Sequence, residues 1–161
     1  MKTIKAGLIS DTHGLVRKEL FTLLDGCSMI IHAGDVGSND IIPQLEKTAP
    51  VYAVRGNIDG IFSDLPLSRY VEIAGHLLYV IHDLDEIDIT PQAISVSAVI
   101  YGHSHLPKIG RKNGVLYVNP GSAGPKRFNM PVSMAILTFI DDTMNVEFRY
   151  IEDTSSEDTD F

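Results

Sequence analysis

Short apolar runs, each closed by a turn residue, recur along the first two-thirds of the chain. They span residues 5–10, 28–33, 50–55, 77–81 and 97–101. Because they are five or six residues long and rich in β-branched residues, they are typical of buried strands. Residues 15–24 and 41–47 instead place apolar side chains at helical spacing. The first third is therefore predicted to be β-α-β-α-β, with parallel strands joined by right-handed crossovers.

The pattern changes after residue 57 and predicts three hairpins. Their strands flank the turn residues Gly75-His76, Asn113-Gly114 and Asp141-Asp142, and Asn-Gly suits a type I′ turn. Residues 90–96, after Thr90-Pro91, are expected to form a short helix. We expect the second half to be antiparallel, and the whole to be an α/β (α+β) fold with two packed mixed β-sheets flanked by helices.

Length and composition predict one globular domain. The chain has 161 residues, of which 44% are hydrophobic. We expect residues 1–151 to form a single domain and the acidic residues 152–161 to be a disordered tail. No apolar stretch approaches the ~18 residues of a membrane span, so no membrane partner is expected. The single cysteine, Cys27, excludes an internal disulfide and favours a cytoplasmic location. The net charge of -8 argues against an extended nucleic-acid surface.

Each of the five apolar runs ends at a side chain that can bind a metal ion. In chain order these side chains are Asp11 and His13, Asp35, Asn57, His82, and finally His103 and His105. Open α/β sheets bind ligands outside the carboxyl ends of their strands. A mixture of carboxylate and imidazole without thiolate suits Mn²⁺, Fe²⁺, Ni²⁺ or Zn²⁺. Two such ions ~3.5–4 Å apart can hold an attacking water and phosphate oxygens.

The order Asp-x-His, Gly-Asp, Gly-Asn, His and Gly-His-x-His resembles the calcineurin-like metallophosphoesterase superfamily. With Asn119-Pro120-Gly121-Ser122 and the small size, it is most similar to the compact bacterial and archaeal phosphodiesterase branch. The resemblance implies a four-layer metallophosphoesterase sandwich and a phosphodiesterase that attacks with a hydroxide bridging two metals. That branch also contains the retromer subunit that uses this fold as a scaffold. A phosphomonoesterase or nucleotide phosphatase and a non-catalytic scaffold are therefore the alternatives.

The resemblance also implies a role for each ligand. It assigns Asp11, His13, Asp35 and His105 to one metal, and Asp35, Asn57, His82 and His103 to the other. Asp35 would bridge the two ions, and Asp35, Asn57 and His103 are the expected catalytic residues. Mn²⁺ is the expected ion, with Ni²⁺, Fe²⁺ or Zn²⁺ as alternatives. The expected partner is a small phosphodiester substrate, and a homo-oligomer is left open.

Two positions depart from the family pattern. The family places a histidine after Gly-Asn that can protonate the leaving group, and this chain has Ile58, which carries no such proton. The glycine that usually follows the fourth-strand histidine is Asp83 here. Because Asp tolerates a positive φ, we expect the turn to keep its conformation and His82 to point into the site.

Several further polar residues surround the predicted site. Arg127 and Lys126, together with Asn57, are expected to hold the substrate phosphate, since a guanidinium matches phosphate oxygens. Asp59 either closes a turn or orients its neighbours, and His32 and His76 are expected to be structural. The acidic run from Asp83 to Asp88 is interpreted as a solvated loop, which would repel polyanions if it lay at the mouth of the site.

Overall fold

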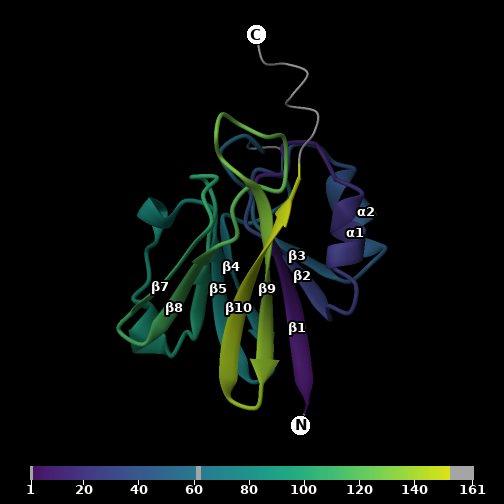
Figure 1. Cartoon of the computed structure of the whole chain (residues 1–161). Coiled ribbons are helices and arrows are strands. Elements are labelled where there is room, and N and C mark those ends of the chain that lie inside the picture. The colour runs from purple at the N-terminus through teal and green to yellow at the C-terminus, as the bar shows by residue number, and fades with distance from the viewer. Residues whose placement is uncertain (1, 61–62, 153–161) are drawn as a thin grey trace.

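Two five-stranded β-sheets pack face to face in the computed structural model, which describes residues 2–60 and 63–152 (Figure 1). The first sheet has the order β10-β9-β1-β2-β3 and the second the order β4-β5-β6-β8-β7. The predicted disordered tail falls outside the described residues, except for residue 152. The strands are β1 Thr3–Ile9, β2 Met29–His32, β3 Val51–Ala53, β4 Ser68–Ile73, β5 His76–Ile81, β6 Ala98–Ile100, β7 Lys108–Lys112, β8 Val115–Asn119, β9 Val132–Ile140 and β10 Thr143–Ile151.

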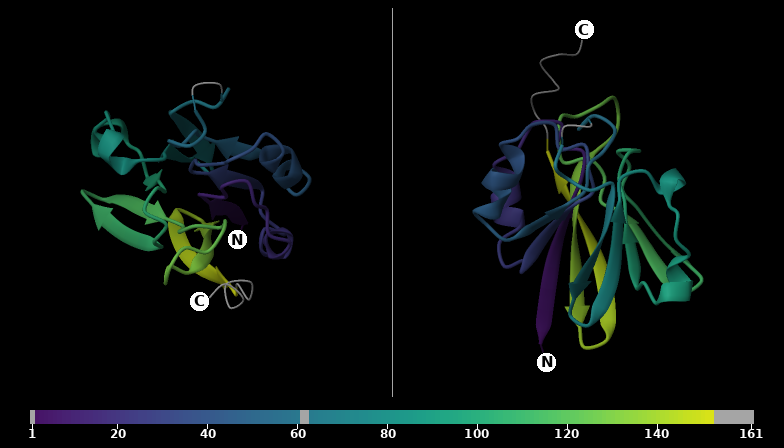
Figure 2. Two further views of the ribbon diagram at one scale, coloured as in Figure 1. Left: turned by 90° about the horizontal axis from the view of Figure 1, so that it is seen from above. Right: turned by 180° about the vertical axis from the view of Figure 1, so that it is seen from behind.

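The predicted β-α-β-α-β unit is confirmed. Strands β1, β2 and β3 pair in parallel, and helices α1 (Glu19–Leu23) and α2 (Ile41–Glu46) connect them. Both helices lie on the outer side of the first sheet (Figure 2). Helix α1 is shorter than the predicted 15–24, because the residues before it form a loop from which Arg17 donates two hydrogen bonds to the Gly124 carbonyl.

The expectation of an antiparallel second half is wrong in one respect. Strands β5 and β6, and β6 and β8, pair in parallel, while β4–β5 and β7–β8 are antiparallel. The last hairpin, β9–β10, joins the first sheet, because β9 pairs antiparallel with β1. Both sheets are therefore mixed, as the predicted fold class requires.

The two outer faces are covered differently. On the first sheet, Ile9 and Ile30 are fully buried against a cluster that includes Leu20 of α1 and Leu45 of α2. The outer face of the second sheet is covered by residues 82–97, which contain the 3₁₀ helices η1 (Leu84–Glu86) and η2 (Pro91–Ile94). The short helix predicted at 90–96 is η2. Across the described part of the chain, α-helices therefore lie on one side only of the sandwich.

The space between the sheets is filled with aliphatic side chains. Leu8 and Ile31 from the first sheet meet Leu78, Ile100 and Val118 from the second, all with no exposed surface. Burial of this apolar area is the main force that holds the sheets together. It also fixes the carboxyl ends of β1, β2, β3, β5 and β6 at one end of the sandwich.

His32, the last residue of β2, is completely buried beneath that end. Its Nδ1 accepts a hydrogen bond from the Gly34 N–H, so Nε2 carries the proton and donates it to the Thr12 hydroxyl 2.9 Å away. That hydroxyl in turn donates to the Val36 carbonyl. Burial lowers the pKa of His32 from 6.5 to about 4, despite the opposing charges of nearby carboxylates. His32 is therefore a neutral structural residue, as expected.

The neutral state of His32 predicts a pH-dependent stability. The unfolded chain takes up a proton near pH 6.5 and the folded chain only near pH 4, so stability is complete above pH 6.5 and decreases as the pH falls toward 4. The loss attributable to His32 should reach about 3 kcal/mol. Urea unfolding of chelator-treated protein at pH 7 and pH 4.5 measures it. His32→Gln should lose this part of the pH dependence, and an unchanged dependence in the variant would contradict the prediction.

Candidate metal centre

The predicted ligands from five strand ends meet at one point. Asp11 follows β1, and its Oδ1 lies 3.4 Å from His105 Nε2, 3.7 Å from His13 Nε2 and 3.8 Å from His82 Nε2. The ligand atoms of Asp11, His13 and His105 all lie within 4.8 Å of one another, as do those of Asp11, Asp35 and His82. Asp11 is thus common to both groups, although the sequence had pointed only to Asp35 as a shared residue.

Asp35, after β2, lies between the two groups of imidazoles. Its Oδ2 is 3.4 Å from His13 Nε2 and 3.3 Å from His82 Nε2. Its Oδ1 accepts a hydrogen bond of 3.0 Å from the Ile58 N–H. One carboxylate oxygen therefore faces a ligand of each predicted ion while the other is held by backbone. This is the placement that a bridging carboxylate requires.

Asn57 and His103 lie on the exposed side of the cluster. One terminal atom of the Asn57 amide is 3.2 Å from His82 Nε2 and 3.3 Å from both oxygens of Asp35. If this atom is the nitrogen, it donates to these acceptors. If it is the oxygen, it faces acceptors alone and needs a cation between them. The His103 ring lies edge-on to the His82 ring at 5.3 Å, and its backbone N–H donates to Asp11 Oδ2.

The donor atoms of the cluster fit divalent cations. Asp11 Oδ1 and His13 Nε2 are buried without a hydrogen-bond partner among the described residues, which is unusual for buried polar atoms. His82 Nδ1 lies 2.7 Å from the Ala33 carbonyl, which can only accept. The Nδ1 proton is therefore committed to that carbonyl, and Nε2 faces the cluster. In the protonated ring Nε2 donates to Asp35, and in the neutral ring its lone pair is directed into the cluster. Metal-binding histidines are commonly oriented in this way.

The backbone of the cluster is unusual as well. Five of the seven predicted ligands have a positive φ: Asp11 (57°), His13 (47°), Asp35 (57°), His103 (75°) and His105 (65°). This left-handed conformation is rare for residues other than glycine, although Asp and His adopt it more readily than most. Strained backbone of this kind gathers at functional sites. Nothing in the sequence indicates this conformation beyond the choice of Asp and His where strands end.

The expectation of a left-handed turn at Asp83 is wrong. Asp83 is extended, with φ −108°, and its carboxylate caps η1 by accepting the Asp85 N–H. Glycine is instead needed on the facing loop. A Cβ on Gly34, whose φ is +103°, would lie 2.7 Å from His82 Nδ1. His82 still points into the cluster, because it packs against a residue without a side chain.

Three ionisable side chains of the cluster have shifted pKa values. The shifts favour the charged forms of Asp35 and His82 and the neutral form of His105. Burial favours protonation of Asp35, but its pKa is lowered overall by hydrogen bonds from His82 and from the Ile58 N–H. Burial disfavours the charged form of His82, yet the hydrogen bond to Asp35 and the charges of Asp11 and Asp35 raise its pKa. Desolvation and the charge of Arg127 lower the pKa of His105, although Asp11 opposes this. His105 is thus held neutral, as a metal ligand must be.

Asp59 joins two of the ligand loops. Its Oδ2 accepts the N–H groups of Val36 and Gly56, and its Oδ1 accepts that of Gly37. The carboxylate therefore connects the loop that carries Asp35 to the loop that carries Asn57. The Asp59 N–H also donates to the Gly56 carbonyl and so closes the turn 56–59. The structure therefore shows both roles that the sequence left open.

Asn119 supports the third ligand loop in a similar way. Its side-chain nitrogen donates to the Gly102 carbonyl and to the Ser104 hydroxyl, and its oxygen accepts the Gly121 N–H. This ties the loop that carries His103 and His105 to the Asn-Pro-Gly-Ser turn. The Ser122 hydroxyl, which belongs to the same turn, donates a hydrogen bond to the Asp11 carbonyl.

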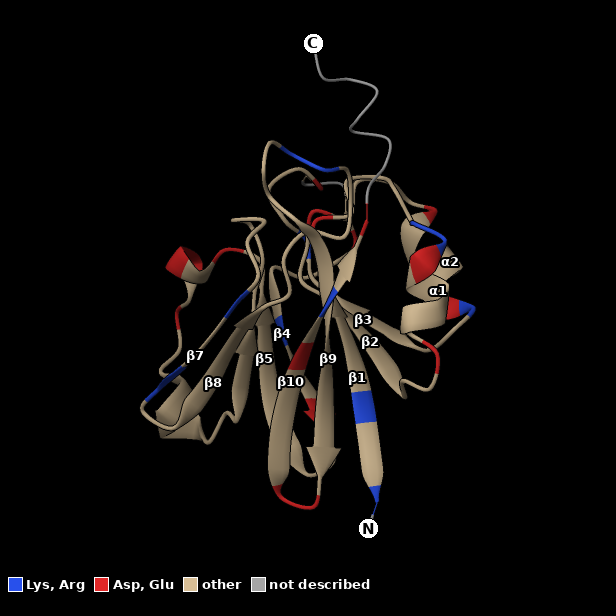
Figure 3. Cartoon of the chain, viewed as in Figure 1, with Lys and Arg blue, Asp and Glu red and all other residues tan. Residues whose placement is uncertain are grey.

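A cleft of about 290 Å³ opens above the cluster. Arg127, one of the two basic residues predicted to bind the substrate phosphate, lines this cleft, and its Nη2 lies 3.4 Å from His13 Nδ1. Lys126 is exposed and does not line it. The loop that carries both residues arches over one end of the sandwich, and Figure 3 shows a blue stretch of Lys and Arg within this otherwise tan loop. The cleft is lined by His13, Asp35, Asn57, Ile58, His103, Ser104, His105, Arg127, Phe128 and Met130.

A second cleft, of about 390 Å³, lies beside the first and shares Asn57 with it. His82 forms part of its wall, together with Arg55. Asp83, Glu86 and Asp88, three members of the acidic run, also line it. The acidic run therefore borders the cluster rather than lying in remote solvent.

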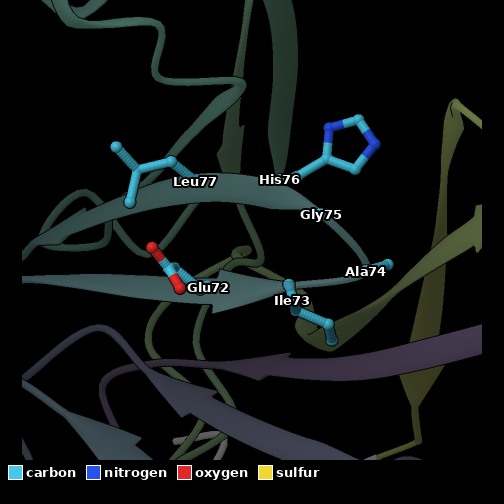
Figure 4. Close-up of a pocket in the computed structure, with 6 residues that line it drawn as sticks. All are labelled: Glu72, Ile73, Ala74, Gly75, His76 and Leu77. Atoms are coloured by element: carbon cyan, nitrogen blue, oxygen red, sulfur yellow. The ribbon is translucent and has the colours of Figure 1, made fainter.

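A third hollow lies at the turn between β4 and β5 (Figure 4) and belongs to a different part of the molecule. It is lined by residues 72–77, at the start of β5, whereas His82 follows the end of that strand. His76 is bound there to the Ser97 hydroxyl and stacks on Phe139. Its role is structural, as expected.

The family model of the calcineurin-like phosphoesterase superfamily domain matches residues 4–142. The chain belongs to this superfamily. A probable metallophosphoesterase of Methanothermobacter thermautotrophicus is 32% identical over 143 residues, which cover 81% of this chain and 83% of the relative. The chain is thus a phosphoesterase-type hydrolase of a metal-dependent family, and its clustered carboxylates and imidazoles are candidate metal ligands.

Solved structures share the phosphoesterase fold along almost the whole chain. A novel archaeal phosphodiesterase has a TM-score of 0.70 at 21% identity, covering 92% of this chain and 100% of its own. Vacuolar Protein Sorting 29 from Cryptosporidium parvum has a TM-score of 0.73 at 19% identity, covering 94% and 99%. In the described part of this phosphoesterase, no helix is long and apolar enough to cross a membrane.

The close approach of Gly34 to His82 gives a test of the cluster. In Gly34→Ala the new methyl group should displace the His82 ring, and affinity for Mn²⁺ at the site that contains His82 should fall roughly 10–100-fold. Isothermal titration calorimetry measures this loss. Gly26→Ala is the matched control, because Gly26 also has a positive φ, of +86°, but has no atom near its missing Cβ. Equal binding by both variants would contradict the prediction.

Proposed function

We propose that this protein is a phosphodiesterase that depends on a dinuclear metal centre. The observation that supports it best is the position of Asp35, one oxygen of which faces both His13 Nε2 and His82 Nε2. Asp11, His13, Asp35 and His105 would hold one ion. Asp35, Asn57, His82 and His103 would hold the other. When bound, two divalent ions neutralise the phosphate and lower the pKa of a water molecule.

Arg127 and Asn57 are the groups that bind and orient the phosphate. The Arg127 guanidinium can only donate, so its contact with His13 Nδ1 needs that nitrogen to be unprotonated. A neutral His13 that binds a cation through Nε2 carries its proton on Nδ1. Arg127 would then have no acceptor at His13, and its guanidinium would be available to a phosphate in the cleft.

The charge around the centre favours diesters over monoesters. Arg127 is the single Lys or Arg among the described residues that line the first cleft. The second cleft carries three acidic residues, Asp83, Glu86 and Asp88, against one arginine, Arg55. A monoester phosphate is largely doubly charged at neutral pH, whereas a diester carries one negative charge. Repulsion by the acidic wall therefore weighs more heavily against monoesters.

The donor set leads us to propose Mn²⁺ as the metal, with Ni²⁺, Fe²⁺ or Zn²⁺ as alternatives. Carboxylate, amide and imidazole ligands without a thiolate suit all four ions. We also retain the proposals of a cytoplasmic location and a small substrate, the latter in keeping with a cleft of about 290 Å³.

A non-catalytic interaction scaffold is the second candidate, because Vacuolar Protein Sorting 29 shares the fold over 94% of this chain. The side chains at the site favour the enzyme. The chain has both carboxylates and all four imidazoles that the family pattern implies as ligands. These side chains point toward one another or pack together. The left-handed backbone at five of these positions is strain of the kind that gathers at functional sites.

The first prediction for this function concerns metal content. Asp35→Asn should lose both ions, since Asp35 is shared, whereas His82→Ala should lose one and retain the other. Turnover of bis(4-nitrophenyl) phosphate should collapse in both variants. His76→Gln is the control, because His76 lies at the far end of β5.

Mass spectrometry of metal-loaded, desalted protein gives the number of ions per chain. Wild-type turnover should stop with chelator and return with Mn²⁺. Two ions retained by Asp35→Asn, or full activity without metal, would exclude the dinuclear centre.

The second prediction concerns Ile58, whose side chain lines the cleft but has no proton to donate. Without a general acid, the rate should depend steeply on the leaving group, with nitrophenyl diesters far faster than alkyl diesters. Ile58→His should accelerate alkyl diesters by about 10²-fold, and Ile58→Asn should not. The measurement is kcat against leaving-group pKa, and a flat profile in the wild type would show that another group supplies the proton.

A further inference from the structure

Phe128 has an unusual backbone and an unusual exposure. It follows Arg127 in a turn closed by the hydrogen bond from the Met130 N–H to the Arg127 carbonyl. Its φ is 51°, a value that turns normally assign to Gly, Asn or Asp. Its side chain is 90% exposed, more than any other exposed large hydrophobic residue in the described chain. A bulky aromatic residue thus occupies a strained position without packing against the protein.

The position of Phe128 relates this exposure to the metal centre. Phe128 lines the same cleft as His13, Asn57 and His105. Two other apolar residues, Ile58 and Met130, line it from the β3 loop and from the same turn. Ile58 is itself 46% exposed. One cleft therefore combines candidate metal ligands, one phosphate-binding arginine and three apolar side chains that are available to a ligand.

We propose that Phe128, with Ile58 and Met130, forms a subsite for a flat aromatic substituent of the phosphodiester substrate. The inference rests on the proposed function and names the class of substrate. Arg127 and Phe128 are adjacent in the turn, so a phosphate held by the guanidinium has its ester group beside the exposed ring. An aromatic ring gains more from contact with Phe128 than a methyl group does, because it buries more apolar area and because paired rings attract beyond the area they bury.

The cleft volume limits the size of this substituent. About 290 Å³ is at the low end of pockets that bind small molecules. This volume accommodates a phosphate and one ring system. The substrate is therefore a small aryl or nucleoside-type diester, in which the flat ring rather than its hydrogen-bonding groups is recognised.

The test compares two singly charged ligands that differ only in the ring. They are the monomethyl esters of phenylphosphonic acid and of methylphosphonic acid, titrated into Mn²⁺-loaded protein by calorimetry. The wild type should bind the phenyl compound roughly five- to tenfold more tightly, as expected for one aromatic contact. Phe128→Gly should bind both compounds about equally, by weakening the phenyl compound alone.

The variants are chosen so that folding does not confuse the result. Phe128→Gly suits the positive φ and should keep or raise the melting temperature. Phe128→Trp should keep the preference, and because the chain has no tryptophan, its emission should change with the phenyl compound and not with the methyl compound. Tyr150→Ala is the control, since Tyr150 is 62% exposed on β10 and does not line the cleft.

The outcomes separate the two proposals. If bis(4-nitrophenyl) phosphate is hydrolysed but the phenyl preference is absent, or survives in Phe128→Gly, the aromatic subsite is wrong and the phosphodiesterase stands. If the metal-loaded protein does not hydrolyse any diester, the proposed function itself fails, whatever the binding data show.

Discussion

Two buried carboxylates, Asp11 and Asp35, face the same small volume. The neighbouring imidazoles, the local backbone conformation and Gly34 all serve to bring these two negative charges together. Each has an imidazole nitrogen within 3.4 Å, and Asp11 Oδ1 has no hydrogen bond from a described residue. Buried negative charges are costly unless paired or bound to metal. The left-handed backbone at both residues and the absence of a side chain at Gly34 bring the groups into contact despite that cost. A cation is the simplest partner that satisfies all of them.

The ligand loops are held by other loops rather than by secondary structure. The Asp59 carboxylate accepts hydrogen bonds from three backbone N–H groups in two loops. Asn119 joins the loop that carries His103 and His105 to the Asn-Pro-Gly-Ser turn. His32 lies below them, neutral and fully hydrogen-bonded. Such preorganisation keeps the donor atoms in place when no ion is bound, so metal binding need not order the site. In contrast to these supporting residues, Asn57, His103 and Arg127 are exposed to solvent.

The centre lies between two clefts of opposite character. One carries Arg127 with the apolar side chains of Ile58 and Phe128, and the other carries Asp83, Glu86 and Asp88. A phosphate at the junction therefore has an attractive side and a repulsive side. This asymmetry is the reason that we propose a small, singly charged ester as the substrate. In the proposed function, the candidate metal ligands would supply the chemistry and the two walls would select the substrate.

The amino-acid sequence by itself determined the strands, the parallel first unit and the carboxylate and imidazole side chains that meet where strands end. These follow from local patterns, because apolar periodicity is set by burial and because parallel strands end at a common edge. Tertiary structure alone decided that β9–β10 joins the first sheet, that β6 pairs in parallel, and that Asp83 is extended. It also decided that Arg127 rather than Lys126 lines the cleft, and that Gly34 makes room for His82. Each of these depends on contacts between residues far apart in the chain, which no local pattern records.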